Sequence, residues 1–371
     1  MLSLTTNASL STFSNRPELF VGDRRIAAGE PVMVIAEIGV NHDGDVGKAM
    51  RLVEAAADAG ADAVKLQVFT ARRLLHPSAS LATYQQNAAE SASEMLRSLE
   101  LSDHEIAKVV AKIRELDMIP LATPFSPEDV GQLVALDLPA IKLASPDLTN
   151  ALLLDAVLDT QRPLILSTGT SGMDEVRWAS RRIKMAGAPH AFLQCVSSYP
   201  TQPEDASLAG MAELAQLGTI VGYSDHTQVM NTGAYATASG ACIIEKHLTL
   251  DRAAPGPDHA ASADPQQLRE YIRRIRLVEQ MVGQIGKNPV DSEAEVRRLS
   301  KQSLVAAIDI PEGVTIERSM LTCQRPGTAI PAMDLDQVIG RVARRNITAG
   351  SMLYWFDLSE TAGDATFAKA A

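Results

Sequence analysis

The sequence predicts an α/β fold, a (β/α)8 TIM barrel followed by a small, mostly β domain. Eight short apolar runs each end on polar or ionisable residues, and stretches with helical patterning separate them. Near residue 300 this pattern gives way to short β-like runs between Gly and Pro turns. Strand and helix alternating eight times is the sequence form of a TIM barrel. The predicted strands are 32–39, 63–69, 119–125, 140–145, 164–169, 191–198, 219–226 and 241–248.

Helical patterning fills the stretches between these strands. Apolar residues recur at helical spacing in 47–59, 104–116, 174–185 and 228–239, which predicts helices that each bury one face. The last barrel helix is expected at 264–283, and its many arginines are typical of a solvated face.

The chain divides into five predicted segments. Residues 1–30 are polar and rich in Ser and Thr, so we expect a loosely ordered lead-in before a barrel at 31–285. A charged linker at 286–300 leads to short β-like runs between Gly and Pro turns at 301–360, which predict a compact domain with little helix. The Ala-rich tail, 361–371, has no periodicity and is expected to be disordered.

Composition narrows the class of protein. The net charge of −11 argues against nucleic acid or an anionic membrane as the main partner. Three cysteines form neither a disulfide framework nor a zinc motif, and two of them fall in predicted strands, where a buried thiol is expected. No apolar run reaches the roughly 18 residues of a transmembrane helix, so a cytoplasmic protein is expected.

Polar residues gather where the predicted strands end. In a TIM barrel these ends form the active-site face, and a barrel has no structural need for such residues there, so they indicate an enzyme. They are Glu37, Lys65, Gln67, Thr123, Lys142, Ser145, Ser167, Ser197, Tyr199, His226 and His247.

Histidines and carboxylates supply the candidate chemistry. His226 and His247 end neighbouring strands, so they can share a divalent metal, although each can also merely hydrogen-bond within its strand end. Glu37 can bind metal, hold a water or move a proton; a salt bridge with a lysine such as Lys65 is the alternative. Asp147 and Asp258 lie on loops, where Asp is more often a turn or cap residue.

The anion-binding signal is distributed along the chain. Lys65 and Lys142 lie inside apolar strands, where an unpaired ammonium is costly, so each must face a carboxylate or an anionic ligand. Hydroxyl donors and a predicted helix N-terminus after 167–169 add to this signal. The hydroxyls belong to Thr123, Ser145, Ser167 and Ser224. Without a Walker loop or Gly-x-Gly-x-x-Gly, a small phosphorylated or carboxylated substrate is favoured over nucleotides.

Motifs in order along the chain resemble the sialic acid synthase family. In the barrel they are Ala36-Glu-Ile-Gly-Val-Asn-His-Asp-Gly44, Val64-Lys-Leu-Gln-Val-Phe69, Thr123-Pro-Phe125, Lys142-Leu-Ala-Ser145, Leu166-Ser-Thr-Gly169, Ser198-Tyr-Pro200, Gly222-Tyr-Ser-Asp-His226, Glu245-Lys-His247 and Pro255-Gly-Pro-Asp-His259. Arg325-Pro-Gly327 and Ile339-Gly-Arg-Val342 resemble the family's antifreeze-like SAF domain. The resemblance runs from about Val32 to Leu358.

This resemblance implies condensation of phosphoenolpyruvate with an open-chain N-acetylated sugar, giving a nine-carbon 2-keto acid and phosphate. It implies a divalent ion, with Mn2+ preferred over Mg2+ or Co2+, on His226 and His247. Glu37 and Asp147 are the expected catalytic carboxylates. Phosphoenolpyruvate is assigned to Lys65, Thr123, Lys142, Ser145, Ser167, Ser197 and Ser224, and the sugar to Gln67, Asp147, Tyr199 and Asp258. Asn87 is a further expected substrate-binding residue.

The resemblance also implies a domain-swapped homodimer in which Arg325 of one chain reaches the other barrel. Pro146 replaces the family's usual Gly, and Ser197 stands where some members have Asn, which leaves the sugar open. N-acetylmannosamine, its 6-phosphate and 2,4-diacetamido-6-deoxy sugars are the options. A barrel synthase with another acceptor and a non-catalytic carbohydrate-binding relative remain as alternatives.

Overall fold

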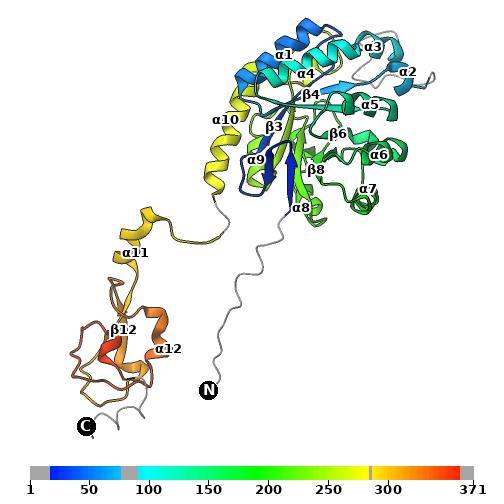
Figure 1. The fold of residues 1–371 in the computed structure, drawn as a ribbon. Coiled ribbons are helices and arrows are strands. Elements are labelled where there is room, and N and C mark those ends of the chain that lie inside the picture. Colours follow the sequence, from blue (N-terminus) through cyan, green and yellow to red (C-terminus); the bar gives the residue numbers. More distant parts are fainter. Residues whose placement is uncertain (1–16, 77–90, 284–285, 360–371) are drawn as a thin grey trace. The chain divides into compact units, whose positions relative to one another are not determined.

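The computed structural model of the chain describes residues 17–76, 91–283 and 286–359 (Figure 1). It divides into two compact units, Met1–Gln284 and Ile285–Ala371. The first contains the predicted barrel, and the second contains the predicted linker and the predicted small domain.

Eight parallel strands close into a barrel in the order β10-β3-β4-β5-β6-β7-β8-β9, which confirms the predicted fold. Their bounds are β3 (Met33–Gly39), β4 (Ala63–Val68), β5 (Ile119–Pro124), β6 (Ile141–Leu143), β7 (Leu164–Ser167), β8 (His190–Cys195), β9 (Ile220–Asp225) and β10 (Ile243–His247).

Helices surround the strands, as Figure 1 shows. In α7 the buried Val176, Ala179, Ser180 and Ile183 follow the 3.6-residue period, so one face packs on the strands. The helices around the barrel are α1 (Val46–Ala59), α4 (Asp103–Glu115), α5 (Pro127–Ala135), α6 (Ala151–Leu158), α7 (Met173–Ala186), α8 (Gly210–Ala215), α9 (Thr232–Ala238) and α10 (Pro265–Val282). Two further helices, α2 (Ala71–Leu74) and α3 (Ala92–Ser98), follow β4 and contact each other.

The expectation of a loose lead-in over 1–30 is wrong for the part that the structure describes. Residues from 17 onward form an antiparallel hairpin of β1 (Glu18–Val21) and β2 (Arg24–Ala27). Leu19, Val21 and Ile26 are each 1% exposed and pack inside the end of the barrel where the strands begin. Along β1 these apolar residues alternate with exposed ones, so one face of the hairpin is apolar and can be buried. The polar stretch that precedes the hairpin made this alternation hard to recognise in the sequence.

Two apolar layers stabilise the barrel unit. The larger lies between strands and helices, and includes Val34, Val64 and Leu166. The smaller fills the barrel interior below the strand ends, where the hairpin meets Met33 and Ile35 of β3. The interior is therefore a packed core at the amino ends of the strands.

The second unit has its own small core around Leu304, Ile316 and Ile330. Its strands β11 (Ser303–Ala306) and β12 (Leu321–Gln324) pair antiparallel, and its helices are α11 (Ala294–Ser300) and α12 (Leu335–Val338). The predicted linker 286–300 is partly helical, because a short 3-10 turn and α11 occupy residues 291–300. The predicted tail 361–371 and residues 1–16 lie outside the described residues.

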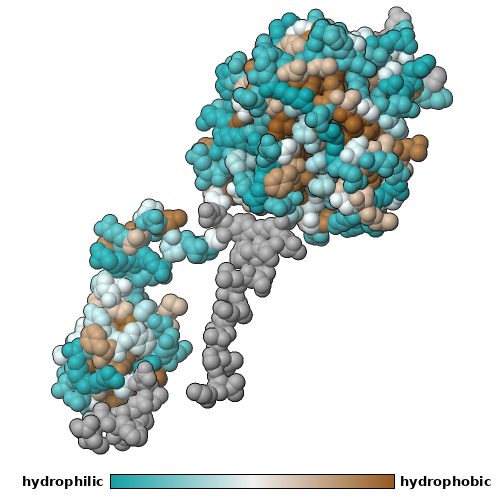
Figure 2. Space-filling model, in the orientation of Figure 1, coloured by the Kyte–Doolittle hydropathy of each residue, from teal (hydrophilic) through white to brown (hydrophobic). Residues whose placement is uncertain are grey.

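Hydrophilic residues cover much of the surface visible in Figure 2. In the described parts of the chain, every helix is too short or too polar to cross a membrane.

Candidate functional site

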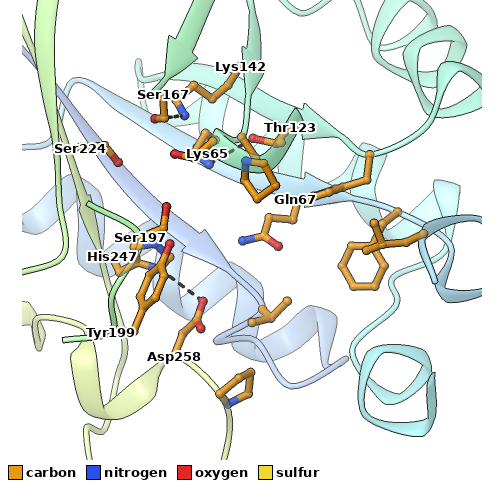
Figure 3. Close-up of a pocket in the computed structure, with 18 of the residues that line it drawn as sticks. Lys65, Gln67, Thr123, Lys142, Ser167, Ser197, Tyr199, Ser224, His247 and Asp258 are labelled. Atoms are coloured by element: carbon orange, nitrogen blue, oxygen red, sulfur yellow. Dashed lines mark hydrogen bonds and ion pairs between the residues drawn. The ribbon is translucent and has the colours of Figure 1, made fainter. Parts of the chain in front are cut away.

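A cavity of about 380 Å³ opens at the carboxyl ends of the barrel strands (Figure 3). It collects most of the side chains that were predicted to form the site. They are Lys65, Gln67, Thr123, Lys142, Ser145, Ser167, Ser197, Tyr199, Ser224, His226, His247 and Asp258. Side chains from almost every strand therefore converge on one space, as the parallel barrel requires.

The two in-strand lysines lie at the base of this cavity. Lys65 Nζ donates to Thr123 Oγ1 at 3.1 Å, and Lys142 Nζ donates to Ser167 Oγ at 2.6 Å. Both side chains are buried, with 5% and 1% of Lys65 and Lys142 exposed. Burial lowers the pKa of Lys142, whereas for Lys65 the carboxylates of Glu245 and Glu37 outweigh burial and raise the pKa.

Glu245 is a charged residue of the site that sequence reasoning missed. Its carboxylate lies between the two lysines, with Oε1 3.8 Å from Lys65 Nζ and Oε2 3.6 Å from Lys142 Nζ, and it accepts from Ser224 Oγ at 3.1 Å. Burial alone would raise the pKa of Glu245, but Lys142 and Lys65 outweigh it and lower that pKa. The sequence feature that could have identified Glu245 is its position two residues before His247, which places both side chains on the inward face of one strand.

Glu37 does not line the cavity. It is fully buried beside Lys65, with which it forms an ion pair, and Gln67 Nε2 lies 3.5 Å from its other oxygen. Burial raises the pKa of Glu37, even though Lys65 acts in the opposite direction. The structure therefore contains the salt bridge between Glu37 and Lys65 that was the alternative interpretation. Glu37 can influence a ligand in the cavity only by its effect on Lys65.

A cluster of serines forms the wall opposite the α2 and α3 side. Gly169 N donates to Ser145 Oγ at 3.0 Å, and a Cβ at Gly169 would collide with Ser197 Oγ, so only glycine lets these groups converge. The predicted helix N-terminus does not contribute to this wall. Helix α7 begins only at Met173, and the Glu175 carboxylate accepts from Gly172 N at 2.8 Å, as in a capping box.

His226 and His247 lie side by side, with ring centroids 5.4 Å apart. His226 Nδ1 donates to the Val196 carbonyl at 2.8 Å, which leaves its Nε2 as the atom with a free lone pair. His247 Nδ1 is buried without a hydrogen bond among the described residues, and Asp258 Oδ2 lies 3.5 Å away. The ring centroids of Tyr199 and His226 are 4.1 Å apart.

This donor set fits a divalent ion that takes its remaining ligands from water or substrate. Imidazole and carboxylate suit first-row divalent metals, and one buried ring nitrogen still lacks a hydrogen bond. Within the described residues, no three His, Cys, Asp or Glu side chains are arranged to hold an ion by themselves.

The remaining predicted residues lie elsewhere. Asp147, in a 3-10 turn after β6, accepts from Asn150 Nδ2 at 3.2 Å and does not line the cavity, which matches the turn alternative. Asn87 lies outside the described residues. Arg325 belongs to the second unit, where it is exposed beside Pro326.

The cavity has one apolar side. Val40, Phe69, Met95 and Leu99 form a separate buried cluster that faces it, and Phe125 packs edge-on against Phe69 at 6.0 Å. Leu74 and Leu96 extend this wall. Charged and hydroxyl groups at the strand ends thus face apolar side chains across one space.

Comparisons with known proteins agree with this geometry. Residues 52–287 match the model of the NeuB family, and 301–359 match the SAF domain. An N,N'-diacetyllegionaminic acid synthase from Legionella pneumophila is 36% identical over 87% of this chain and 93% of its own length. An N-acetylneuraminate-9-phosphate synthase from Mus musculus is 33% identical over 81% of this chain and 84% of its own.

A solved structure shows the same architecture. The N-acetylneuraminic acid (sialic acid) synthetase from Leptospira borgpetersenii, in complex with citrate, superposes with a TM-score of 0.71 at 32% identity. The alignment covers 76% of this chain and 95% of that one. The named relatives are acid synthases, which supports an enzyme. The resemblance predicted from the motifs is confirmed: the chain belongs to the NeuB family, the sialic acid synthases, and carries a C-terminal SAF domain.

Proposed function

We propose that the chain condenses phosphoenolpyruvate with an N-acetylated sugar aldehyde to give a nine-carbon 2-keto acid and phosphate. The observation that carries this proposal is the pair of buried lysines around Glu245 at the base of the cavity. Two ammonium groups with hydroxyl donors at Thr123 and Ser167 suit a small ligand that carries both a phosphate and a carboxylate.

In this reaction C3 of phosphoenolpyruvate attacks the aldehyde carbon, and the aldehyde oxygen takes up a proton. Water then adds to C2 and loses one proton, and the C2–O bond to phosphate breaks as the new C2 hydroxyl loses its proton, which leaves the ketone and inorganic phosphate. Lys65 and Lys142 hold the anion and offset the negative charge of the departing phosphate. Glu245 keeps both ammonium groups aimed into the cavity, and Glu37 holds Lys65 from behind.

We assign the divalent ion to His226 and His247, with Asp258 beside them, and Mn2+ is preferred over Mg2+ or Co2+. When bound, the ion supplies Lewis acidity toward the sugar aldehyde. Tyr199 and Asp258 line the same side and are assigned to sugar hydroxyls. Gln67, which reaches the cavity beside Glu37, is assigned to the sugar as well.

The apolar wall favours an acceptor that carries methyl groups. The acetamido and 6-deoxy methyl groups of a 2,4-diacetamido-6-deoxy sugar suit Phe69, Met95 and Leu99, whereas a 6-phosphate needs a cation. Among the described residues, the cavity lining holds two ammonium groups, those of Lys65 and Lys142, and both lie beside Glu245 at the base of the cavity. Similarity to a diacetyllegionaminic acid synthase supports the same acceptor class.

We also propose a homodimer in which Arg325 of one chain donates to the sugar in the other. Mixing inactive Arg325→Ala subunits with inactive Lys142→Met subunits tests this, because one active site of each mixed dimer then has both native residues. Activity is expected to reappear on exchange. Verified exchange without activity would remove Arg325 from this role.

The direct test of the function is phosphate release from phosphoenolpyruvate with a panel of acceptors. The panel holds N-acetylmannosamine, its 6-phosphate and the 2,4-diacetamido-6-deoxy sugar, with Mn2+ present. The diacetamido sugar is expected to give the highest kcat/KM. Bridging-oxygen 18O in phosphoenolpyruvate is expected in the released phosphate, since the C–O bond breaks. No turnover with any acceptor would favour the non-catalytic alternative.

A further inference from the structure

The two residues that precede the candidate metal-binding histidines form a buried ion pair outside the barrel. Asp225 and Lys246 are register partners on β9 and β10, and Lys246 Nζ lies 3.1 Å from Asp225 Oδ2. They are 1% and 4% exposed. Side chains alternate along a strand, so this pair faces the helices while His226 and His247 face the cavity.

A third group comes from helix α10. Tyr271 donates its hydroxyl to Asp225 Oδ2 at 2.7 Å, and Lys246 Nζ lies 5.4 Å from the Tyr271 ring centroid. A Cβ at Gly233 on α9 would lie 2.5 Å from the Tyr271 hydroxyl, so glycine there makes room for the tyrosine. The cavity described above uses none of these side chains.

The same pair holds the backbone beyond His226. Thr227 N donates to Asp225 Oδ1 at 2.8 Å, and Lys246 donates to the Thr227 carbonyl. Asp225 and Lys246 therefore bind the residue after His226 as well as each other, and one of them directly precedes each histidine. A shift of this pair would rotate both strand ends together.

We infer that Asp225, Lys246 and Tyr271 form a positioning network that sets the orientation of the His226 and His247 imidazoles. The inference rests on the proposed function only in that these two histidines act in the reaction. Groups that hydrogen-bond directly to metal-binding imidazoles cost about 10–100-fold in metal affinity or activity when they are lost. This network acts through the strand backbone, so its loss is expected to cost less.

A second ion-pair network offers a matched control at the opposite end of the barrel. Asp62 accepts from Val34 N at 2.7 Å, and it pairs with Arg276 of α10 at 2.6 Å and with Arg24 at 2.8 Å. It also ties a strand to α10, but at the amino-terminal end of the strands. Asp62→Asn therefore reports what the loss of such a network costs in stability alone.

The test compares Asp225→Asn, Tyr271→Phe and Asp62→Asn with the native chain. The first readout is 15N NMR of the histidine rings without metal, with His226 and His247 assigned through His226→Gln and His247→Gln. Asp225→Asn is expected to shift both signals and to lower kcat by up to about 10-fold, the lower end of the range for direct partners of such histidines, with KM for phosphoenolpyruvate within about twofold. Tyr271→Phe keeps the ion pair and gives a smaller change in the same direction.

Asp62→Asn is expected to lower Tm and leave both histidine signals and kcat unchanged. Folded Asp225→Asn and Tyr271→Phe chains with native histidine signals would overturn the inference. If Asp225→Asn fails to fold, Tyr271→Phe decides. Absence of turnover in the native chain would count against the proposed function, while the NMR comparison would still decide the role of the network.

Discussion

The two ends of the barrel interior are built from the same strands and differ completely in chemistry. On β3 the inward residues pass from Met33 and Ile35 to Glu37, and on β10 they pass from Ile243 to Glu245 and His247. The amino-terminal end is a closed apolar core under the hairpin, and the carboxyl end is a cavity with buried charges. Along each of these strands, the inward residues that build the apolar core are thus followed two positions later by the residues that line or support the cavity.

The largest expected effect is loss of a charge at the carboxyl end. Lys142→Met leaves Glu245 with one ammonium fewer and removes a contact to the anion in the proposed function. We expect kcat/KM for phosphoenolpyruvate to fall on the order of 10²–10³-fold, measured by phosphate release. Lys112→Met, on α4, removes an outlying lysine that pairs with Glu115 at 3.3 Å, and should change nothing. Equal effects of the two would contradict the assignment.

The second comparison concerns histidines at the two ends. His247→Ala at the carboxyl end of β10 should lower Mn2+ affinity on the order of 10²-fold while the chain stays folded, as calorimetry with Mn2+ alone would show. His190→Ala, where β8 begins, should leave that affinity unchanged. In the native chain, chelation should abolish turnover, and Mn2+, Co2+ or Mg2+ should restore it. Full turnover of metal-free His247→Ala would exclude a metal from the reaction.

At the amino-terminal end the same reasoning predicts the opposite outcome. Ile35→Ala leaves a void in a fully buried layer and should cost about 2–5 kcal/mol in the free energy of unfolding. The kcat/KM of the folded variant should remain within about twofold of native, because no cavity residue moves. Denaturant unfolding and phosphate release together check this. A stable but inactive Ile35→Ala chain would show that the two ends are coupled.

The smallest expected effect is a pH dependence. Burial raises the pKa of Glu37 above its ordinary value of 4.5, so the folded chain holds this proton more tightly than the unfolded chain. The contribution of Glu37 to stability is therefore present below pH 4.5 and is lost as pH rises through the folded pKa. The loss is about 1.4 kcal/mol for each pH unit that separates the folded pKa from the unfolded one.

Glu37→Gln removes this titration. The Tm of the native chain relative to Glu37→Gln should therefore fall between about pH 5 and pH 8 in parallel thermal scans. A difference that stays constant or grows with pH would place the pKa of Glu37 at or below its ordinary value.

The barrel could be predicted because its signal is local. Each strand is a short apolar run before polar residues, and each helix shows its own periodicity, so the bounds of β4 and β5 follow from the sequence directly. The hairpin of Glu18–Ala27 was missed because its three buried side chains gain their partners only when the barrel closes beneath them. That contact joins residues far apart in the chain.

For the site, residue types were predictable but their partners were not. His226, His247 and the two lysines end neighbouring strands, and parallel geometry brings them together. Whether Glu37 faces the cavity or pairs with Lys65 depends on side-chain packing between β3 and β4, and the sequence left both alternatives open. Asp147 similarly turned toward Asn150 in its own loop, a local contact that competes with any ligand.

A structure of the chain with phosphoenolpyruvate bound would decide whether the buried lysine pair is the anion site. We expect the ligand at the carboxyl end of the barrel, with its anionic groups within hydrogen-bond distance of Lys65 and Lys142 and its C3 carbon facing the His226 and His247 side. Phosphoenolpyruvate bound at another surface, with the Lys65, Lys142 and Glu245 cluster unchanged, would contradict the proposed function.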